Sequence, residues 1–280
     1  TEMAGVLFTG HIWLRVPESI LLRWNGTLQP GVMAKDLILK TIGDIGHAGA
    51  TYQSMEFSGT AIQALSMDER MCISNMCVEA GAKCGLIPPD EKTDAYLKVH
   101  GCEKQYEALT ADTDAVYVRT LDYDAGALVP QVACPHNVDN VHPITEVKGT
   151  RLDRAYIGSC TGGRVEDIAI AAKILKGRHI PEYTRLIIVP ASNEVMQECM
   201  KAGYIQDLMN AGATITTPGC GACLGAHEGI LAPGEVCITS TNRNFPGRMG
   251  STEALMYLAS PATVAASMVN GCITDPRDFL

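Results

Sequence analysis

Residues 154–176, RAYIGSCTGGRVEDIAIAAKILK, decide the fold class of this chain. A short strand is predicted at residues 154–157, a Gly-rich turn follows, and residues 165–176 carry apolar side chains at helical spacing. Four later segments continue this order of strands and helices: 186–189, 193–209, 213–217 and 235–239. Strands that alternate with helices in this way favour an α/β fold with a mainly parallel sheet and helices on its faces.

Three cysteines lie in Gly-rich turns that follow predicted strands. Cys160 comes directly after the strand at 154–157, and Cys220 and Cys223 form a Cys-x-x-Cys turn in the segment PGCGACLG, residues 218–225. In parallel α/β sheets, ligands bind at the carboxyl ends of the strands. We therefore expect the three thiols to gather at one edge of the sheet.

The chemistry of these thiols has four interpretations from the residues alone. A Cys-x-x-Cys pair serves as a redox dithiol, as half of a zinc site or as part of an iron–sulfur site. His227, four residues after Cys223, completes a tetrahedral zinc set. Three thiolates without a fourth ligand hold a cubane cluster and leave one iron open for chemistry. The fourth interpretation is three unrelated buried thiols.

Two arginines follow the strand predicted at 235–239. Arg243 and Arg248 lie in the segment STNRNFPGR, residues 240–248. A guanidinium binds a carboxylate through two parallel hydrogen bonds, which a lysine cannot reproduce. Although solvation at the surface explains a lone arginine, the position beside a strand end predicts anion binding.

The N-terminal half contains a second set of alternating elements. Strand and turn are predicted at 16–29, a helix at 31–42 and a strand around residues 55–57. Ser66 and Glu69 have the spacing of a capping box that opens a helix ending near Ala80.

Asn75 and Glu79 are four residues apart on this last helix, so they share one of its faces. The alternative interpretation of this pair is a solvated polar stripe.

The middle of the chain is predicted to be less regular. A polar surface connection is predicted at 86–101, and a helix followed by short strands at 105–133. Residues 134–143 contain two prolines and several turn-formers, and we expect a domain boundary there. The Cys134-x-His136 pair in this segment is a metal-ligand fragment or, as we favour, part of a linker.

Composition limits the class of protein. Of the 280 residues, 46% are apolar, which predicts a globular chain with a substantial core. The formal net charge of −9 argues against a nucleic-acid or anionic-membrane partner. No run of about 20 apolar residues and no secretory leader is visible, so we expect a cytoplasmic protein. Eleven cysteines in so long a chain indicate reduced thiols rather than a disulfide framework.

Three motifs in this order resemble the aconitase family, and particularly its isopropylmalate dehydratase large subunits. They are Gly158-Ser159-Cys160-Thr161, Cys220-Gly221-Ala222-Cys223, and the segment from Asn242 to Arg248, NRNFPGR. The resemblance covers essentially the whole chain. It implies aconitase-like three-layer α/β/α domains with mainly parallel sheets, and a hydro-lyase of leucine or other amino-acid biosynthesis that moves a hydroxyl group by dehydration and rehydration.

The resemblance also implies roles for residues of this chain. Cys160, Cys220 and Cys223 would hold a [4Fe-4S] cluster with one open iron. Asn75 and Asn242 would hydrogen-bond near the cluster, and Glu79 would assist proton transfer at the leaving hydroxyl. The remaining two residues, Arg243 and Arg248, would bind the carboxylates of a small hydroxy acid. The base that removes the proton would be a serine on a swivelling domain of a separate small subunit.

Two features depart from the family pattern. Gly162 stands where the family usually has asparagine, and we expect it to loosen a contact near the cluster. Thr1 falls just after an upstream aspartate–serine–histidine motif of the family, so we expect a missing N-terminal portion or a further chain as partner. The expected units are a remnant at 1–16, an α/β domain at 17–143 and a cysteine-bearing α/β domain at 144–280.

Three classes of function remain open. The first is the large subunit of a 3-isopropylmalate dehydratase or of a related homoaconitate, citraconate or dimethylmalate enzyme, which the resemblance favours. The second is a non-catalytic iron–sulfur module, and the third is a zinc-stabilised domain.

Overall fold

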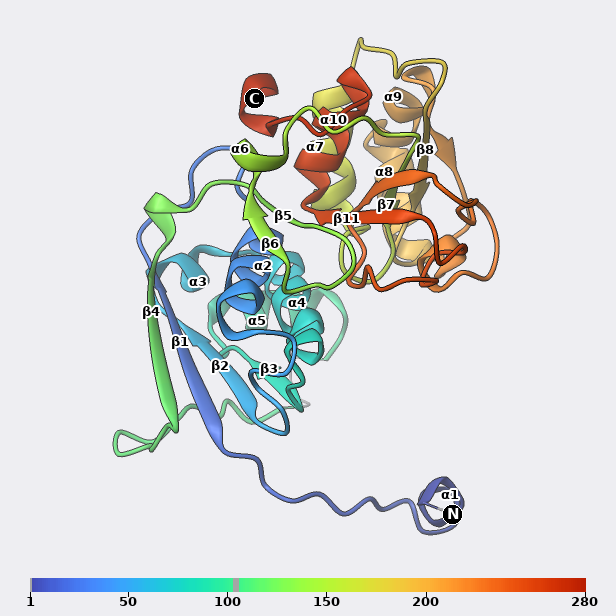
Figure 1. The fold of residues 1–280 in the computed structure, drawn as a ribbon. Coiled ribbons are helices and arrows are strands. Elements are labelled where there is room, and N and C mark those ends of the chain that lie inside the picture. The colour runs from blue at the N-terminus through green and yellow to red at the C-terminus, as the bar shows by residue number, and fades with distance from the viewer. Residues whose placement is uncertain (1, 103–105) are drawn as a thin grey trace.

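Two β-sheets form the framework of the molecule in the computed structural model, which describes residues 2–102 and 106–280. One sheet has four strands and is built from the N-terminal half, and the other has seven strands and is built mostly from the C-terminal half (Figure 1). The α/β class with mainly parallel sheets, predicted from the order of elements, is confirmed.

The four-stranded sheet is entirely parallel. Its order is β3 (Cys84–Leu86), β2 (Ser54–Ser58), β1 (Ser19–Asn25) and β4 (Arg119–Asp124), so β4 is an edge strand. β1 carries the buried side chains of Ile20, Leu22 and Trp24 at every second position, which places them on one face. These side chains belong to the N-terminal hydrophobic core together with Leu37 and Ile38 of helix α2 (Ala34–Ile45).

The seven-stranded sheet is parallel except at one side. Its order is β6 (Val141–Pro143), β5 (Gln131–Ala133), β11 (Leu255–Ala259), β10 (Val236–Thr239), β7 (Arg154–Gly158), β8 (Arg185–Val189) and β9 (Thr214–Ile215). The pairs β6–β5 and β5–β11 are antiparallel. Alternate residues of β7 reach two separate cores, because Ala155 and Ile157 pack in the large C-terminal core and Tyr156 packs in a smaller one.

Helices cover the sheets and join the two halves. Helix α7 (Val165–Leu175) packs against α8 (Asn193–Lys201), α9 (Tyr204–Asn210) and α10 (Pro261–Asn270). Helix α2 packs against α4 (Met67–Met76) and also against β5 and β6. Through α2, the N-terminal half contacts two strands of the second sheet. The remaining helices are α1 (Glu2–Thr9), α3 (Thr60–Ala64), α5 (Glu91–Val99) and α6 (Ile144–Val147).

Several boundaries differ from the predictions. The segment 86–101, expected to be a surface connection, contains α5, and the helix begins after Asp90 because its carboxylate accepts hydrogen bonds from the backbone of Lys92 and Thr93. The helix expected at the start of 105–133 is wrong for residues 106–118, which have no regular structure, and residue 105 lies outside the described residues. The segment predicted as one helix at 193–209 is two helices, with Gly203 in the left-handed region between them.

The predicted domain division at residue 143 stays a proposal. Both β5 and β6 precede this point, and both pair with the seven-stranded sheet of the C-terminal half. The irregular segment predicted at 134–143 contains β6 at its end, where Val132 of β5 pairs with His142. Strands β5 and β6 thus lie on the N-terminal side of the proposed division although they belong to the second sheet.

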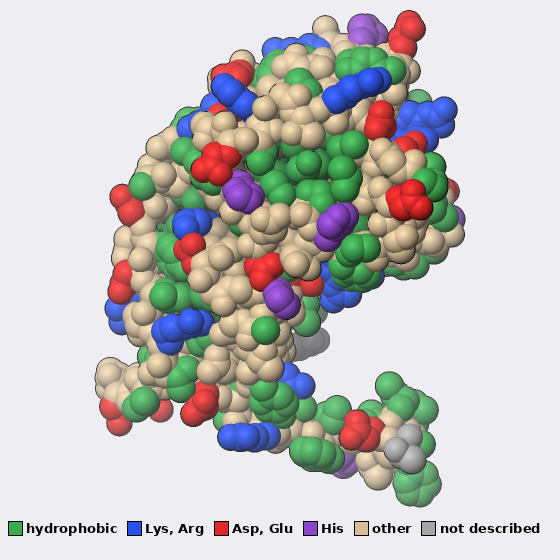
Figure 2. All heavy atoms as spheres, viewed as in Figure 1, with side chains coloured by type: hydrophobic (Ala, Val, Ile, Leu, Met, Phe, Trp, Pro, Cys, Tyr) green, Lys and Arg blue, Asp and Glu red, His purple; other side chains and the backbone are tan. Residues whose placement is uncertain are grey.

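An N-terminal arm, residues 2–16, projects away from the two sheets (Figure 1). The arm exposes large apolar side chains, which Figure 2 shows as green spheres on the extension: Met3, Leu7, Phe8, Ile12, Trp13, Leu14 and Val16. On the same face of the molecule, acidic and basic side chains are interspersed (Figure 2). No helix of the described residues is long and apolar enough to span a bilayer.

Candidate active site

The Cys160 loop joins β7 to α7 and is held closely by the backbone around it. Ser240, at the end of neighbouring β10, places its hydroxyl 3.1 Å from the amide nitrogen of Gly158 and 3.1 Å from the carbonyl oxygen of Gly162. A Cβ atom added to Gly162 would lie 2.6 Å from the carbonyl oxygen of Ser240. The expectation that Gly162 loosens this region is therefore wrong, because the missing side chain allows two strand-end loops to approach each other.

The Cys220–Cys223 turn has a different support. It contains a single 3₁₀ turn at Gly221–Leu224, and the amide of Cys223 donates to the carbonyl oxygen of Cys220 at 2.9 Å. The buried hydroxyl of Tyr156 donates to the same carbonyl oxygen at 2.9 Å. Burial raises the pKa of Tyr156, so this hydroxyl keeps its proton. The thiol of Cys220 is exposed, whereas Cys223 is buried.

Side chains from both halves of the molecule reach the thiols. The amide nitrogen of Asn75, at the end of α4, lies 3.5 Å from Sγ of Cys160. Arg248 lies in the loop after β10, and its Nη2 is 3.9 Å from Sγ of Cys223. Asn242 donates from Nδ2 to Oδ1 of Asn75 at 3.1 Å. The structure thus brings the predicted residues of the two halves into contact around the cysteine loops.

Glu79 and Arg243 form an ion pair beside these contacts. Nε of Arg243 lies 2.8 and 3.0 Å from the two carboxylate oxygens of Glu79. Burial raises the pKa of Glu79, while the hydrogen bond from Arg243 acts in the opposite direction. The side chain of Glu79 is only 9% exposed, so the alternative of a solvated polar stripe is wrong for this residue.

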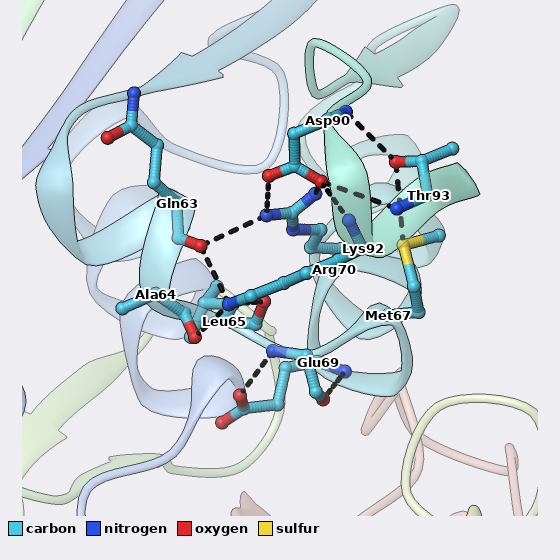
Figure 3. A network of polar contacts seen from close by, with 10 residues as sticks. Gln63, Ala64, Leu65, Met67, Glu69, Arg70, Asp90, Lys92 and Thr93 are labelled. Atoms are coloured by element: carbon cyan, nitrogen blue, oxygen red, sulfur yellow. Dashed lines mark hydrogen bonds and ion pairs between the residues drawn. The ribbon is translucent and has the colours of Figure 1, made fainter. Parts of the chain in front are cut away.

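A polar network fixes the helix that carries Asn75 (Figure 3). Ser66 and Glu69 form the predicted capping box at the start of α4. One turn later, Arg70 makes two hydrogen bonds to Asp90, at 2.8 and 2.5 Å, and lowers the pKa of Asp90 to about 2. Nζ of Lys92 donates to the carbonyl oxygens of Gln63, Ala64 and Leu65, at the end of α3. These contacts tie α3, α4 and α5 together and so set the position of Asn75 and Glu79.

A cavity of about 200 Å³ lies next to the ion pair. Glu79 and Arg243 line it together with Val78, Phe245 and His136. The cavity also borders His47, whose Nδ1 is 2.5 Å from a carboxylate oxygen of Asp139. From the sequence, Cys134-x-His136 was assigned to a linker in preference to a metal site, and His47 was not detected because it lies in no motif.

The zinc interpretation needs at least three side chains placed around a single metal ion. Among residues 2–102 and 106–280, no three histidine, cysteine or acidic side chains are arranged to hold one. His227, the proposed fourth zinc ligand, is exposed and lies 3.5 Å from the carboxylate of Glu228. This finding includes Cys160, Cys220 and Cys223, so within the described residues the three thiols expected to gather do not form a site for a single metal ion.

Sequence reasoning missed three residues that hold the site. Tyr156 and Ser240 support the two cysteine loops, and Lys35 of α2 reaches the backbone after β10. Tyr156 lies in an apolar strand pattern, Ser240 opens the segment STNRNFPGR but was given no role, and Lys35 lies in no motif. Only their buried polar groups, seen in three dimensions, distinguish them.

The sequence of this chain matches the model of one protein family along almost its whole length. The model for the aconitase family (aconitate hydratase) matches residues 1–271. The chain belongs to the aconitase family. Membership of this family implies an iron–sulfur cluster as cofactor.

Relatives of about 50% identity match along the whole chain. The probable methanogen homoaconitase large subunit of Methanosarcina mazei is 51% identical over 277 residues, which cover 99% of this chain and 70% of that protein. The 3-isopropylmalate dehydratase large subunit 2 of Archaeoglobus fulgidus is 50% identical over 280 residues, covering 100% and 67%. The corresponding large subunit of Halothermothrix orenii is 49% identical, covering 100% and 66%. The chain thus spans about two thirds of the length of these relatives.

A solved structure shows a more distant likeness. Holo aconitase X of Thermococcus kodakaraensis matches with a TM-score of 0.43 and 12% identity, covering 81% of this chain and 49% of that one.

Proposed function

We propose that this chain is the iron–sulfur large subunit of a hydro-lyase that isomerises a hydroxy di- or tricarboxylate, such as 2-isopropylmalate and 3-isopropylmalate, by dehydration and rehydration. One observation supports this most strongly. Asn75 contacts Cys160, and Asn242 contacts Asn75, although Asn75 lies on a helix of the N-terminal half and the other two lie in loops of the C-terminal half. A polar set that converges on a thiol from both halves fits a reaction centre better than it fits a structural thiol.

Cys160, Cys220 and Cys223 would hold the [4Fe-4S] cluster. The surroundings fit such a group, because buried polar atoms next to two of these cysteines have no hydrogen-bond partner in the described residues. They are Ser159 Oγ, Thr161 Oγ1 and Arg248 Nε. Buried polar atoms without partners are costly, and a bound group supplies partners for them. When bound, a cluster with three thiolate ligands supplies a Lewis-acidic iron for the substrate hydroxyl.

Arg243 and Arg248 would bind the substrate carboxylates. In the described part of the chain, Glu79 takes only the Nε donor of Arg243, which leaves the two terminal nitrogens for an anion. Arg248 stacks on Phe245, with its guanidinium carbon 5.8 Å from the ring centre. This contact places the second guanidinium over a ring that lines the cavity.

Glu79 would transfer a proton at the leaving hydroxyl. Burial favours the protonated carboxyl, and the adjacent guanidinium of Arg243 favours the ionised one. A carboxyl group held between these influences is suited to give up and take back a proton within one reaction cycle. Asn75 and Asn242 would orient the reacting oxygen through their amide groups.

A second polypeptide would supply the base. The relatives described above are named large subunits, and the resemblance implies a small subunit with a swivelling domain and a catalytic serine. We propose that this chain assembles with such a subunit.

Reconstitution tests this function. The chain is loaded anaerobically with iron and sulfide and combined with a small subunit and with a polypeptide that covers the part of the relatives' length that this chain does not span. Dehydration of 3-isopropylmalate is then followed by ultraviolet absorbance. We expect this assembly to dehydrate the substrate. The variant Arg243→Lys should raise KM roughly tenfold or more. The control Arg185→Lys, at the first residue of β8, should leave KM unchanged. A cluster-loaded assembly without activity on any tested hydroxy acid would leave the non-catalytic iron–sulfur module as the better interpretation.

Homoaconitate is the second candidate substrate. The probable homoaconitase large subunit is about as similar to this chain as the 3-isopropylmalate dehydratase subunits are. Citraconate and dimethylmalate are further possibilities within the same chemistry. Comparison of kcat/KM for these acids in the reconstituted assembly identifies the preferred one.

A further inference from the structure

Lys35 is a buried cation that the proposed mechanism does not use. It lies in the first turn of α2 and is 1% exposed. Its Nζ donates to the carbonyl oxygens of Ser240 and Thr241, at 2.8 and 2.5 Å. These two acceptors lie more than 200 residues later in the chain, on the segment that leaves β10.

The placement of this ammonium group is energetically demanding. Removing a charged group from water is expensive unless it is paired. Within residues 2–102 and 106–280, no carboxylate lies within 4 Å of Nζ, so the two carbonyl groups are its identified partners. Burial lowers the pKa of Lys35, and the nearby acidic groups, including Cys72, Asp167 and Cys223, oppose that effect.

The two carbonyl groups directly precede Asn242 and Arg243. In the same turn, Ser240 contacts Gly158 and Gly162 of the Cys160 loop, and its amide donates to the carbonyl oxygen of Tyr156 at 3.0 Å. The backbone held by Lys35 is thus the one that presents Asn242 to Asn75 and Arg243 to Glu79.

We propose that Lys35 is a positioning residue for the substrate-binding turn: its ammonium group fixes the backbone of Ser240 and Thr241 and thereby sets Asn242 and Arg243 against the face of the N-terminal half that carries Asn75 and Glu79. The role assigned to the turn rests on the proposed function. The backbone contact itself does not, so the two are tested separately.

Hydrogen exchange measured by mass spectrometry on the full chain tests the backbone contact. In Lys35→Met, we expect amides within 240–248 to exchange roughly tenfold faster, because two hydrogen bonds to this turn are lost. Peptides from β2 and β8 should keep their protection. The matched control is Lys40→Met, on the same helix, where the lysine is partly exposed and bonded to Asp44. Unchanged exchange of residues 240–248 in Lys35→Met would overturn the proposal.

A second variant covers the case in which Lys35→Met fails to fold. Lys35→Gln keeps a hydrogen-bond donor and removes the charge. We expect it to retain part of the protection of 240–248, and protection as low as in a variant with no donor would argue against fixation through hydrogen bonds.

Kinetics of the assembled, cluster-loaded enzyme test the consequence for substrate binding. We expect Lys35→Met to raise KM for 3-isopropylmalate roughly tenfold, and to add little to the effect of Arg243→Lys, because both changes remove the same interaction. Fully additive effects would show that Lys35 acts independently of Arg243. Faster exchange at 240–248, with a wild-type assembly that dehydrates no hydroxy acid, would refute the proposed function and leave the backbone contact standing.

Discussion

The Cys160 loop and the Cys220–Cys223 turn carry the same chemical group but are built differently. Gly162 and Gly163 of the first loop have no room for a side chain, since an added Cβ would lie 2.6 Å from the carbonyl oxygen of Ser240 and 2.5 Å from that of Val189, respectively. In the second turn, a Cβ added to Gly219 would meet no atom within 4 Å. The glycines that follow Cys160 are therefore closely packed, although Cys160 itself is exposed, and the residue before Cys220 has open space around it.

This difference indicates how a three-thiol site is prepared. The position of Cys160 is set by the strands beneath it, since β7, β8 and β10 all contribute to the packing around its loop. The position of the pair depends on the short 3₁₀ turn and on the hydroxyl of Tyr156. We infer that the first loop is formed before a cofactor binds and that the second adjusts to it.

The largest effect is expected from removing a thiol. Cys160→Ser and Cys223→Ser should each lower the iron and sulfide bound per chain by roughly tenfold or more after anaerobic reconstitution, because a serine hydroxyl replaces a thiolate ligand. Metal and sulfide analysis measures this loss. Cys84→Ser, which changes an exposed cysteine of β3, is the control and should bind as much as the wild type. Equal cluster content in all three variants would contradict the assigned ligand set.

The next effect concerns the packed backbone. Gly162→Ala should destabilise the fold by about 3 kcal/mol, because the new methyl group forces the loops after β7 and β10 apart. Urea denaturation of the cluster-free chain measures the change in free energy of unfolding. Gly219→Ala is the matched control in the open turn and should cost less than about 0.5 kcal/mol. Equal costs for the two variants would remove the contrast between the loops.

The contact that joins the Cys160 loop to β10 should matter somewhat less. Ser240→Ala removes a fully buried hydroxyl that contacts both Gly158 and Gly162, and it should cost about 2 kcal/mol. Unfolding in urea measures this loss. Ser251→Ala, in a partly exposed position later in the same region, is the control. A stability equal to that of the wild type would show that Ser240 is not needed to join the loops.

The smallest effect is expected at the open turn. Tyr156→Phe removes one hydrogen bond to the carbonyl oxygen of Cys220, which retains the amide of Cys223 as a second donor, so the cost should be about 1 kcal/mol. Thermal unfolding measures it, with Tyr183→Phe as the control because Tyr183 is exposed. A loss larger than that of Ser240→Ala would reverse the proposed order of the two loops.

The sequence predicted four strands of the seven-stranded sheet, β7, β8, β9 and β10, but it did not predict β11, and β6 lies in a segment expected to be irregular. The strand expected at 154–157 is β7, and the strand expected at 235–239 is β10. The capping box at Ser66 also appears where local chemistry placed it. These features depend on neighbouring residues, which a sequence displays directly.

Features that depend on tertiary structure were not accessible in the same way. Helix α5 has no buried residue, so it lacks the apolar face by which a helix is recognised. The pairing of Glu79 with Arg243 joins residues 164 positions apart, and only the folded chain brings them together. Lys35 has the character of a surface residue in the sequence, and its burial follows from the docking of α2 against the second sheet.

The outer strands of the two sheets limit edge-to-edge pairing of strands between molecules. In the described residues, three of the four sheet edges end in very short strands, β3, β6 and β9, and β6 ends at Pro143, which has no amide hydrogen to donate. The long edge strand β4 carries Asp122 and Asp124 at exposed positions. A second molecule that added its own strand there would bring like charges side by side. The polypeptide therefore combines two mostly parallel sheets with little opportunity for edge-to-edge aggregation.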